Sequence, residues 1–274
     1  MRTPAVAAAF AVALTLPACS TNPVTGRSQF MIVSEDQAIS QSAQAYSSLM
    51  GQMQRQGRLS DDPALSARVR TITNQVVQQA VRYRPETGRW RWQMQVVEGA
   101  DVNAFCMAGG KMAIYTGLIE KVRPTDAELA HVIGHEIAHA LSNHTAEKMS
   151  VAQASQLGAA VLGAVAQSRG LPVGASEAQL LTTVGVQLPN SRTAETEADR
   201  IGIELVARAG YDPYAAVSLW RKMMAATGSR GSVEFLSTHP AAENRIAELQ
   251  ALAPRMMPLY EAAKGPQARG LRRQ

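Results

Sequence analysis

The sequence predicts an α+β domain that is mainly helical and carries a small antiparallel sheet. Three observations lead to this prediction. Apolar residues recur at helical spacing through much of the chain, one region near residue 95 alternates apolar and polar residues, and capping residues precede several helical stretches. The length of 274 residues and a composition that is 46% apolar and 18% charged exclude a disordered chain and a polytopic membrane protein.

The first 18 residues are expected to be a lipoprotein signal peptide. A basic residue is followed by an uncharged, alanine-rich run that is too short for a convincing transmembrane helix. The run ends Leu16-Pro17-Ala18-Cys19, which resembles the bacterial lipobox apart from its proline. Cys19 is therefore the expected lipidation site, and cleavage that leaves the cysteine unmodified is the alternative. The polar residues 19–33 are expected to form a lipidated tether.

Two helices are predicted ahead of the sheet. Residues 34–56 begin with Ser34 and Gln37, which form a capping-box pattern. Asp62-Pro63 predicts a second helix, with a cap followed by proline at the first helical position. Apolar residues recur at helical spacing behind it, at Val69, Ile72, Val76, Val77 and Ala80.

The sheet is predicted where the period changes to two. Residues 90–96 alternate apolar and polar side chains, as a half-buried strand does. Residues 102–107 and 111–116 are two further apolar runs joined by Ala108-Gly109-Gly110, which indicates a hairpin turn. We expect three antiparallel strands, with Cys106 packed in the core rather than acting as a reactive thiol.

The second half of the chain is expected to be mostly helical. Thr125 and Glu128 form a capping box ahead of a helix predicted to run to about Met149. Residues 171–190 lack a clear period and are expected to form a long loop. The remaining predicted segments are helices at 193–209, 212–226 and 241–252, which complete a domain spanning 34–252, and a disordered basic tail at 253–274.

The positive charge is concentrated outside the predicted domain. The formal net charge is +5, of which residues 253–274 contribute +4 and Arg2 one more. Residues 19–252 therefore sum to zero, with 21 basic and 21 acidic side chains. A neutral body with a basic tail does not match a surface that follows a phosphate backbone, so nucleic acid is excluded as a partner.

Four of the five histidines lie within fourteen residues of one predicted helix, and they include an H-E-x-x-H motif at 135–139. Residues four apart on a helix differ by about 40° and about 6 Å, so His135 and His139 can reach one ion. Glu136 lies about 100° round from His135, off the metal but close enough to act as a general base. Imidazole and carboxylate ligands with an open fourth position favour zinc.

A third ligand is expected outside this motif. His131 would place three imidazoles in line over about 12 Å, too far to converge on one ion, so it is expected to pack or hydrogen-bond beside the site. His144 lies off the face and is expected to be structural. Glu195 and Asp199 are four apart and share a face, whereas Glu197 points away. One carboxylate would bind the metal and the other would orient a ligand histidine, although acidic residues near a helix start also serve the helix dipole.

Three strings resemble a known family. They are Glu128 to His139, Ser191 to Asp199, and Ser237-Thr238-His239-Pro240. They resemble the gluzincin metallopeptidase family that includes the heat-shock protease HtpX and the CAAX prenyl protease. Together with Asn22-Pro23-Val24-Thr25-Gly26 and the lipobox, they are similar to its periplasmic lipoprotein branch, that of BepA and LoiP, over roughly residues 20–252.

The resemblance implies a zincin-like metalloprotease fold built around the H-E-x-x-H helix. It implies one zinc ion per chain, held by His135, His139 and Glu195. Glu136 would then be the catalytic base, and Asp199 would orient a ligand from behind.

Two further residues have alternative interpretations. In some relatives the histidine of the Thr-His-Pro string lies over the zinc as a fourth ligand that leaves for catalysis, and His239 is the matching position. Otherwise it is a histidine that precedes a helix. Arg245 would contact a substrate carbonyl or the oxyanion, or form a surface ion pair. His239 and residues 171–190 are candidates for a plug or lid.

The resemblance also implies an activity and a location. It implies a periplasmic zinc-dependent endopeptidase of envelope quality control, anchored by lipid to the bacterial outer membrane, whose substrates are misfolded or outer-membrane polypeptides. The alternative is a zinc-binding chaperone or assembly lipoprotein with little protease activity. The chain ends before the helical repeats with which BepA-like proteins dock on outer-membrane assembly machinery, so no such partner is assigned.

Overall fold

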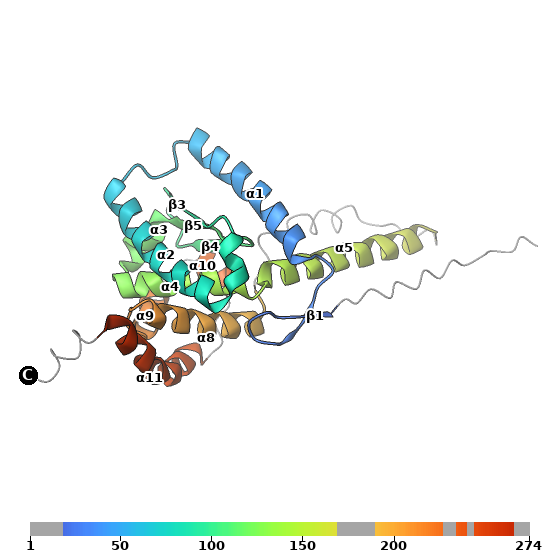
Figure 1. Ribbon diagram of the computed structural model, residues 1–274. Helices are drawn as coiled ribbons and strands as arrows, with labels where there is room; N and C mark the ends of the chain where they lie inside the picture. Colours follow the sequence, from blue (N-terminus) through green and yellow to red (C-terminus); the bar gives the residue numbers. More distant parts are fainter. Residues whose placement is uncertain (1–18, 169–189, 227–233, 240–243, 266–274) are drawn as a thin grey trace, which may run out of the picture.

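Helices form most of the molecule, and a three-stranded sheet lies among them (Figure 1). The computed structural model describes residues 19–168, 190–226, 234–239 and 244–265. Because these residues form mainly helices with a small sheet, the α+β prediction is confirmed. In chain order the elements are β1 (Cys19–Thr21), β2 (Ser28–Phe30), α1 (Glu35–Arg55), α2 (Pro63–Tyr83), the 3-10 helix η1 (Pro85–Arg89), β3 (Gln93–Val97), β4 (Ala104–Met107), β5 (Lys111–Tyr115), α3 (Thr116–Val122), α4 (Asp126–Leu141), α5 (His144–Ser168), α8 (Arg192–Arg208), α9 (Ala215–Ala226), α10 (Glu234–Thr238) and α11 (Arg245–Lys264).

The predicted helix starts are confirmed at three N-caps. Ser34 and Gln37 form the capping box that opens α1, and Thr125 forms the corresponding box at the start of α4. The Asp62 carboxylate accepts hydrogen bonds from two backbone amides in the first turn of α2, next to Pro63. Each cap satisfies amides that have no partner inside the helix.

The sheet has the order β3-β5-β4, and its direction differs from the prediction. β4 and β5 form the expected antiparallel hairpin, with Gly109 and Gly110 at φ +76° in the turn, where a side chain would be strained. β3 instead pairs with β5 in parallel, so the expectation of three antiparallel strands is wrong. The cause is the connection at 98–103, which carries the chain past β5 to its far side before the hairpin begins.

Both faces of the sheet are covered. Met112 and Ile114 on β5 belong to the main core, whereas Ala113 between them packs with Met53 of α1. The central strand is consequently almost entirely buried, which explains the apolar run that follows Lys111.

Helix α4 is the centre of the fold. It packs against α8, α2, α9 and β4, and every residue from Glu128 to Leu141 is buried. The helix ends at Leu141 rather than near residue 149, because Asn143 adopts a left-handed conformation (φ 55°) that asparagine tolerates. α5 then begins at His144 and runs outward from the body (Figure 1).

The C-terminal helix is longer than predicted. α11 contains Pro254 and Pro258 and still extends to Lys264, where the sequence predicts disorder after residue 253. Its buried residues, which include Ala253 and Tyr260, lie in a helix that packs on α8 and α9, and this packing outweighs the cost of proline. The predicted loop at 171–190 lies outside the described residues except for Asn190.

The predicted tether contains local structure. β1 and β2 form an antiparallel pair in which Cys19 lies opposite Phe30, and β2 packs against α5. Of the helices within the described ranges, none is long and apolar enough to cross a membrane.

Candidate active site

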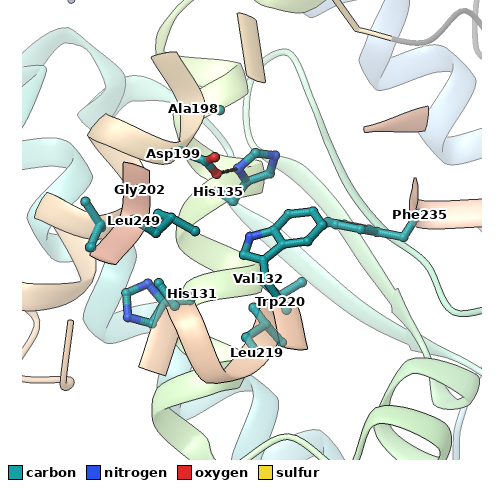
Figure 2. Close-up of a pocket in the computed structure, with 12 residues that line it drawn as sticks. His131, Val132, His135, Ala198, Asp199, Gly202, Leu219, Trp220, Phe235 and Leu249 are labelled. Carbon is teal, nitrogen blue, oxygen red and sulfur yellow. Dashed lines mark hydrogen bonds and ion pairs between the residues drawn. The ribbon is translucent and has the colours of Figure 1, made fainter. Parts of the chain in front are cut away.

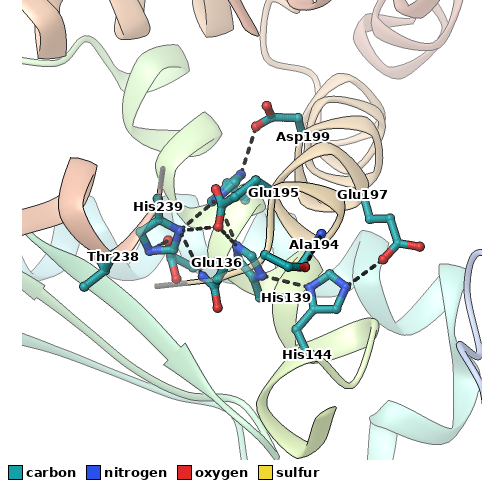
Figure 3. Close-up of polar contacts among 12 residues, drawn as sticks. Glu136, His139, His144, Ala194, Glu195, Glu197, Asp199, Thr238 and His239 are labelled. Carbon is teal, nitrogen blue, oxygen red and sulfur yellow. Dashed lines mark hydrogen bonds and ion pairs between the residues drawn. The ribbon is translucent and has the colours of Figure 1, made fainter. Parts of the chain in front are cut away.

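Four side chains from three helices bring their donor atoms together (Figure 3). His135 and His139 come from α4, and their Nε2 atoms lie 3.1 Å apart. Glu195 reaches them from α8, with its oxygens 3.2 Å from His135 Nε2 and 3.3 Å from His139 Nε2. His239, which directly follows α10, places Nδ1 3.0 Å from Glu195 and 3.3 Å from His135 Nε2. We call these four residues the donor cluster.

The donor cluster fits a zinc ion. A tetrahedral zinc with bonds of about 2.0–2.1 Å to nitrogen and oxygen requires donors roughly 3.3 Å apart, close to the spacings observed. All four side chains are buried. Burial raises the pKa of the Glu195 carboxyl, but the charges and hydrogen bonds of His139 and His135 outweigh it and hold the pKa far below its ordinary value, so this donor is a carboxylate. Burial lowers the pKa of His139 well below its ordinary value. At His135 burial also lowers the pKa, but Glu195 and Asp199 outweigh it and raise the pKa to about 9, so a metal that binds there must displace a proton.

Glu136 lies beside the cluster with one oxygen unpaired. Its Oε1 is buried and makes no hydrogen bond within the described part of the chain, although His239 Nε2 lies 3.4 Å away. Burial raises the pKa of the Glu136 carboxyl. A desolvated carboxylate with a free lone pair next to a metal site is suited to accept a proton from water.

Asp199 holds His135 from behind. Its Oδ1 lies 3.0 Å from His135 Nδ1, which leaves Nε2 of the imidazole directed at the other donors. Arg245 donates to the same Asp199 oxygen at 2.6 Å and to Glu195 at 3.2 Å. The Arg245 guanidinium also lies 3.7 Å from the centre of the Trp220 ring. Arg245 could therefore contact a substrate directly only if its ion pair with Asp199 or Glu195 were broken.

The structure adds two residues that the sequence reasoning placed elsewhere. His144 Nδ1 lies 2.8 Å from His139 Nδ1, and His144 Nε2 lies 3.0 Å from Glu197 Oε2 (Figure 3). Burial raises the pKa of Glu197, but hydrogen bonds from His144 and Arg27 outweigh it and lower the pKa to about 2. On a single helix that continues to residue 149, as the sequence predicts, His144 would point away from His139. The break at Asn143 brings the two side chains into contact.

His131 is not part of the donor cluster, as the helix geometry predicts. Its Nε2 lies 3.0 Å from the Asp212 backbone oxygen, and burial lowers its pKa to about 4. Figure 2 shows it on the wall of a small pocket behind the site, together with Trp220 and Phe235. The pocket measures about 20 Å³, which is enough room for a water molecule but not for a peptide side chain.

Comparison with known proteins agrees with this geometry. Residues 63–253 match the model of a family described as peptidase family M48. The chain is 36% identical to the mitochondrial metalloendopeptidase OMA1 of Schizosaccharomyces pombe over 60% of its length and 47% of that protein. It is 32% identical to the bovine OMA1 over 91% of its length and 49% of that protein.

A bacterial protein is also similar. The chain is 30% identical to the beta-barrel assembly-enhancing protease of Yersinia pestis, over 76% of its length and 43% of that protein. The chain thus spans about half the length of these curated relatives.

Proposed function

Because this chain belongs to peptidase family M48, we propose that it is a zinc-dependent endopeptidase. One observation carries the proposal: His135, His139 and Glu195 present three donors at zinc spacing, and Glu136, between the two histidines on α4, has one buried oxygen without a hydrogen bond. Fold membership alone would not assign an activity, whereas this arrangement matches the ligands and the base that metal-assisted hydrolysis needs.

The residues have separate roles in the proposed reaction. Zinc, when bound, supplies a Lewis acid that polarises a peptide carbonyl and activates water. Glu136 accepts the proton of the attacking water and returns it to the leaving amine. Asp199 accepts the Nδ1 proton of His135, which keeps that imidazole in the tautomer whose Nε2 lone pair faces the metal.

The sheet offers a place for the substrate backbone. β4 is an edge strand that packs against α4, and the backbone of Cys106 on this strand hydrogen-bonds to the Glu136 carboxylate. An extended polypeptide that pairs with β4 would therefore pass beside the catalytic helix. Such strand addition binds the substrate through its main chain, so it would accept unfolded segments of many different sequences.

His239 gives the site a fourth protein donor, whereas catalytic zinc sites usually have three protein ligands and leave the fourth coordination position open. We propose that His239 is a removable ligand whose departure admits substrate. The same observation favours the alternative function, a zinc-binding chaperone or assembly lipoprotein, if His239 stays in place.

Location is proposed from the N-terminal sequence and the bacterial relative. The lipobox-like string ending at Cys19 supports lipid anchoring in the periplasm, at the outer membrane. The name of the Yersinia relative supports a role in envelope protein quality control. The substrates would then be misfolded or outer-membrane polypeptides.

The test compares zinc content and casein cleavage in the wild type, Glu136→Gln and Glu204→Gln. Glu204 provides the matched control, because it lies on α8 in a partly exposed ion pair with Arg208. We expect about one zinc per chain in all three. Cleavage is expected to fall by about 10²-fold or more in Glu136→Gln alone. Absence of zinc from the wild type would refute the proposal, and zinc without cleavage, even in His239→Ala, would favour the chaperone.

A further inference from the structure

Glu197 accepts hydrogen bonds from a segment that lies about 170 residues earlier in the sequence. Thr25 Oγ1 donates to its Oε1 at 2.6 Å, and Arg27 Nε lies 3.0 and 3.1 Å from its two oxygens. Asn22 Nδ2 approaches it at 3.5 Å. The carboxylate is thereby fixed on one side by residues 22–27, and its Oε2 faces His144 on the other.

Residues 22–27 are themselves tightly folded. The Asn22 side-chain oxygen accepts hydrogen bonds from the amides of Val24 and Thr25, and the Asn22 amide donates to the Arg27 carbonyl at 2.7 Å. Gly26 has φ +75°, which the turn requires. The turn therefore presents the Thr25 hydroxyl and the Arg27 guanidinium on the same carboxylate.

Arg27 fastens this turn to a second helix. Its two terminal nitrogens donate to the two oxygens of Glu147 on α5, at 2.8 and 2.7 Å. Gln29 donates to Glu147 and to the Ser142 carbonyl at the end of α4. The segment is therefore anchored at the break between α4 and α5, beside the residue that contacts His139.

The hydrogen-bond chain has one consistent direction. A neutral His139 that offers the Nε2 lone pair to a metal carries its proton on Nδ1, and this proton is donated to His144 Nδ1. His144 must then carry its own proton on Nε2 and donate it to Glu197. A carboxylate at the end of the chain enforces this order, because it only accepts.

We propose that residues 22–27 support the metal site from outside, by holding Glu197 so that Glu197, through His144, fixes the tautomer and orientation of the ligand His139. Thr25, Arg27, Glu197 and His144 form the support chain, and all four are positioning residues. The inference rests on the proposed zinc site. It also extends that site beyond residues 63–253, the part matched by the family model.

Asp199 orients the ligand His135 directly, and the support chain orients the ligand His139 in the same manner through His144. His135 has a carboxylate at 3.0 Å from Nδ1, whereas His139 reaches its carboxylate through an intervening imidazole. Outer partners of this kind typically change metal affinity by 10–100-fold when they are removed.

The test measures zinc affinity of the full chain by competition with a chelator, together with the visible absorption of the cobalt-substituted protein. We expect Glu197→Gln to weaken zinc binding about tenfold or more and to alter the cobalt spectrum. Thr25→Val should weaken binding in the same direction, and Thr25→Ser, which restores the hydroxyl, should bind like the wild type. Glu204→Gln is the carboxylate control on the same helix and should change neither readout.

Each result has a definite meaning. A folded Glu197→Gln chain that binds zinc within twofold of the wild type and gives the same cobalt spectrum overturns the inference. If Glu197→Gln does not fold, the Thr25 pair decides, because equal zinc affinities of Thr25→Val and Thr25→Ser overturn the inference. A wild-type chain that binds no zinc overturns the proposed function itself, and with it the support role.

Discussion

Gly134 on α4 and Gly202 on α8 lie against each other where the two helices pack. A β-carbon on Gly202 would lie 3.0 Å from the backbone nitrogen of His135, and one on Gly134 would lie 3.1 Å from the Gly202 carbonyl oxygen. The helices therefore approach to backbone contact. Since α4 carries two donors and α8 carries Glu195, this contact sets the distance across the metal site.

Gly202→Ala is predicted to weaken zinc binding without touching a donor. The added methyl group must push α8 away from His135 by a few tenths of an ångström, which costs about 1–3 kcal/mol of folding free energy. We expect a lower zinc affinity by competition titration and a lower Tm. Gly51→Ala on α1 is the control, because its β-carbon meets only Arg55 at an ordinary 3.5 Å, and it should stabilise by about 0.5–1 kcal/mol. Unchanged zinc affinity in Gly202→Ala would contradict the prediction.

His239→Ala is predicted to raise proteolytic activity several-fold. The substitution removes the fourth donor and leaves His135, His139 and Glu195, the usual number of protein ligands at a catalytic zinc. The measurement is kcat/KM on an unstructured peptide, with zinc content determined on the same samples. Retained zinc with lower activity would show that His239 assists the reaction rather than restrains it.

Arg245→Met is predicted to destabilise the metal-free protein more than the zinc-loaded one. Removing the guanidinium leaves Asp199 and Glu195 without their shared cation, and loss of one partner from a buried ion pair costs about 3–5 kcal/mol. Bound zinc would replace part of the missing positive charge. Urea unfolding with and without chelator measures the difference. Arg245→Lys keeps the charge and should be intermediate, whereas an equal loss in both states would contradict this explanation.

Glu128→Gln is predicted to lower stability at neutral pH but not in acid. Burial raises the pKa of Glu128, but hydrogen bonds from Lys222, Ser218 and the Thr125 backbone lower it below its ordinary value of 4.5. The stabilisation by this carboxylate is therefore complete above pH 4.5 and is lost as pH falls through the lower folded-state pKa. We expect about 1–3 kcal/mol between wild type and variant at pH 7. Urea unfolding of chelated protein from pH 7 to pH 3 should show this gap closing, and a constant gap would count against the ion pair.

The part of the site that lies on single helices was predictable from sequence. The spacing of His135, Glu136 and His139 and that of Glu195 and Asp199 follow from helix periodicity, and the caps at Ser34 and Thr125 fix where two helices start. These features depend on residues only a few positions apart, so local rules suffice.

The remainder depends on tertiary packing. The parallel pairing of β3 depends on the path of residues 98–103, and alternation of side chains carries no information about it. Helix α11 keeps two prolines because α8 and α9 cover its buried face. The contact of His144 with Glu197 follows from the break at Asn143 and from the packing of α8 on α4, and residues 22–27 reach Glu197 from far away in the sequence. None of these features is visible in the local sequence pattern.

The donors of the metal site are widely separated along the chain, and this has a consequence for biosynthesis. The contacting atoms of His135 and His239 lie 104 residues apart in sequence, and those of Arg27 and Glu197 lie 170 apart. A ribosome must therefore translate past Glu195 before the three proposed ligands can meet, and past His239 before the fourth donor can join them. During synthesis the donor cluster is therefore assembled in steps, and His239, the proposed removable ligand, joins it last.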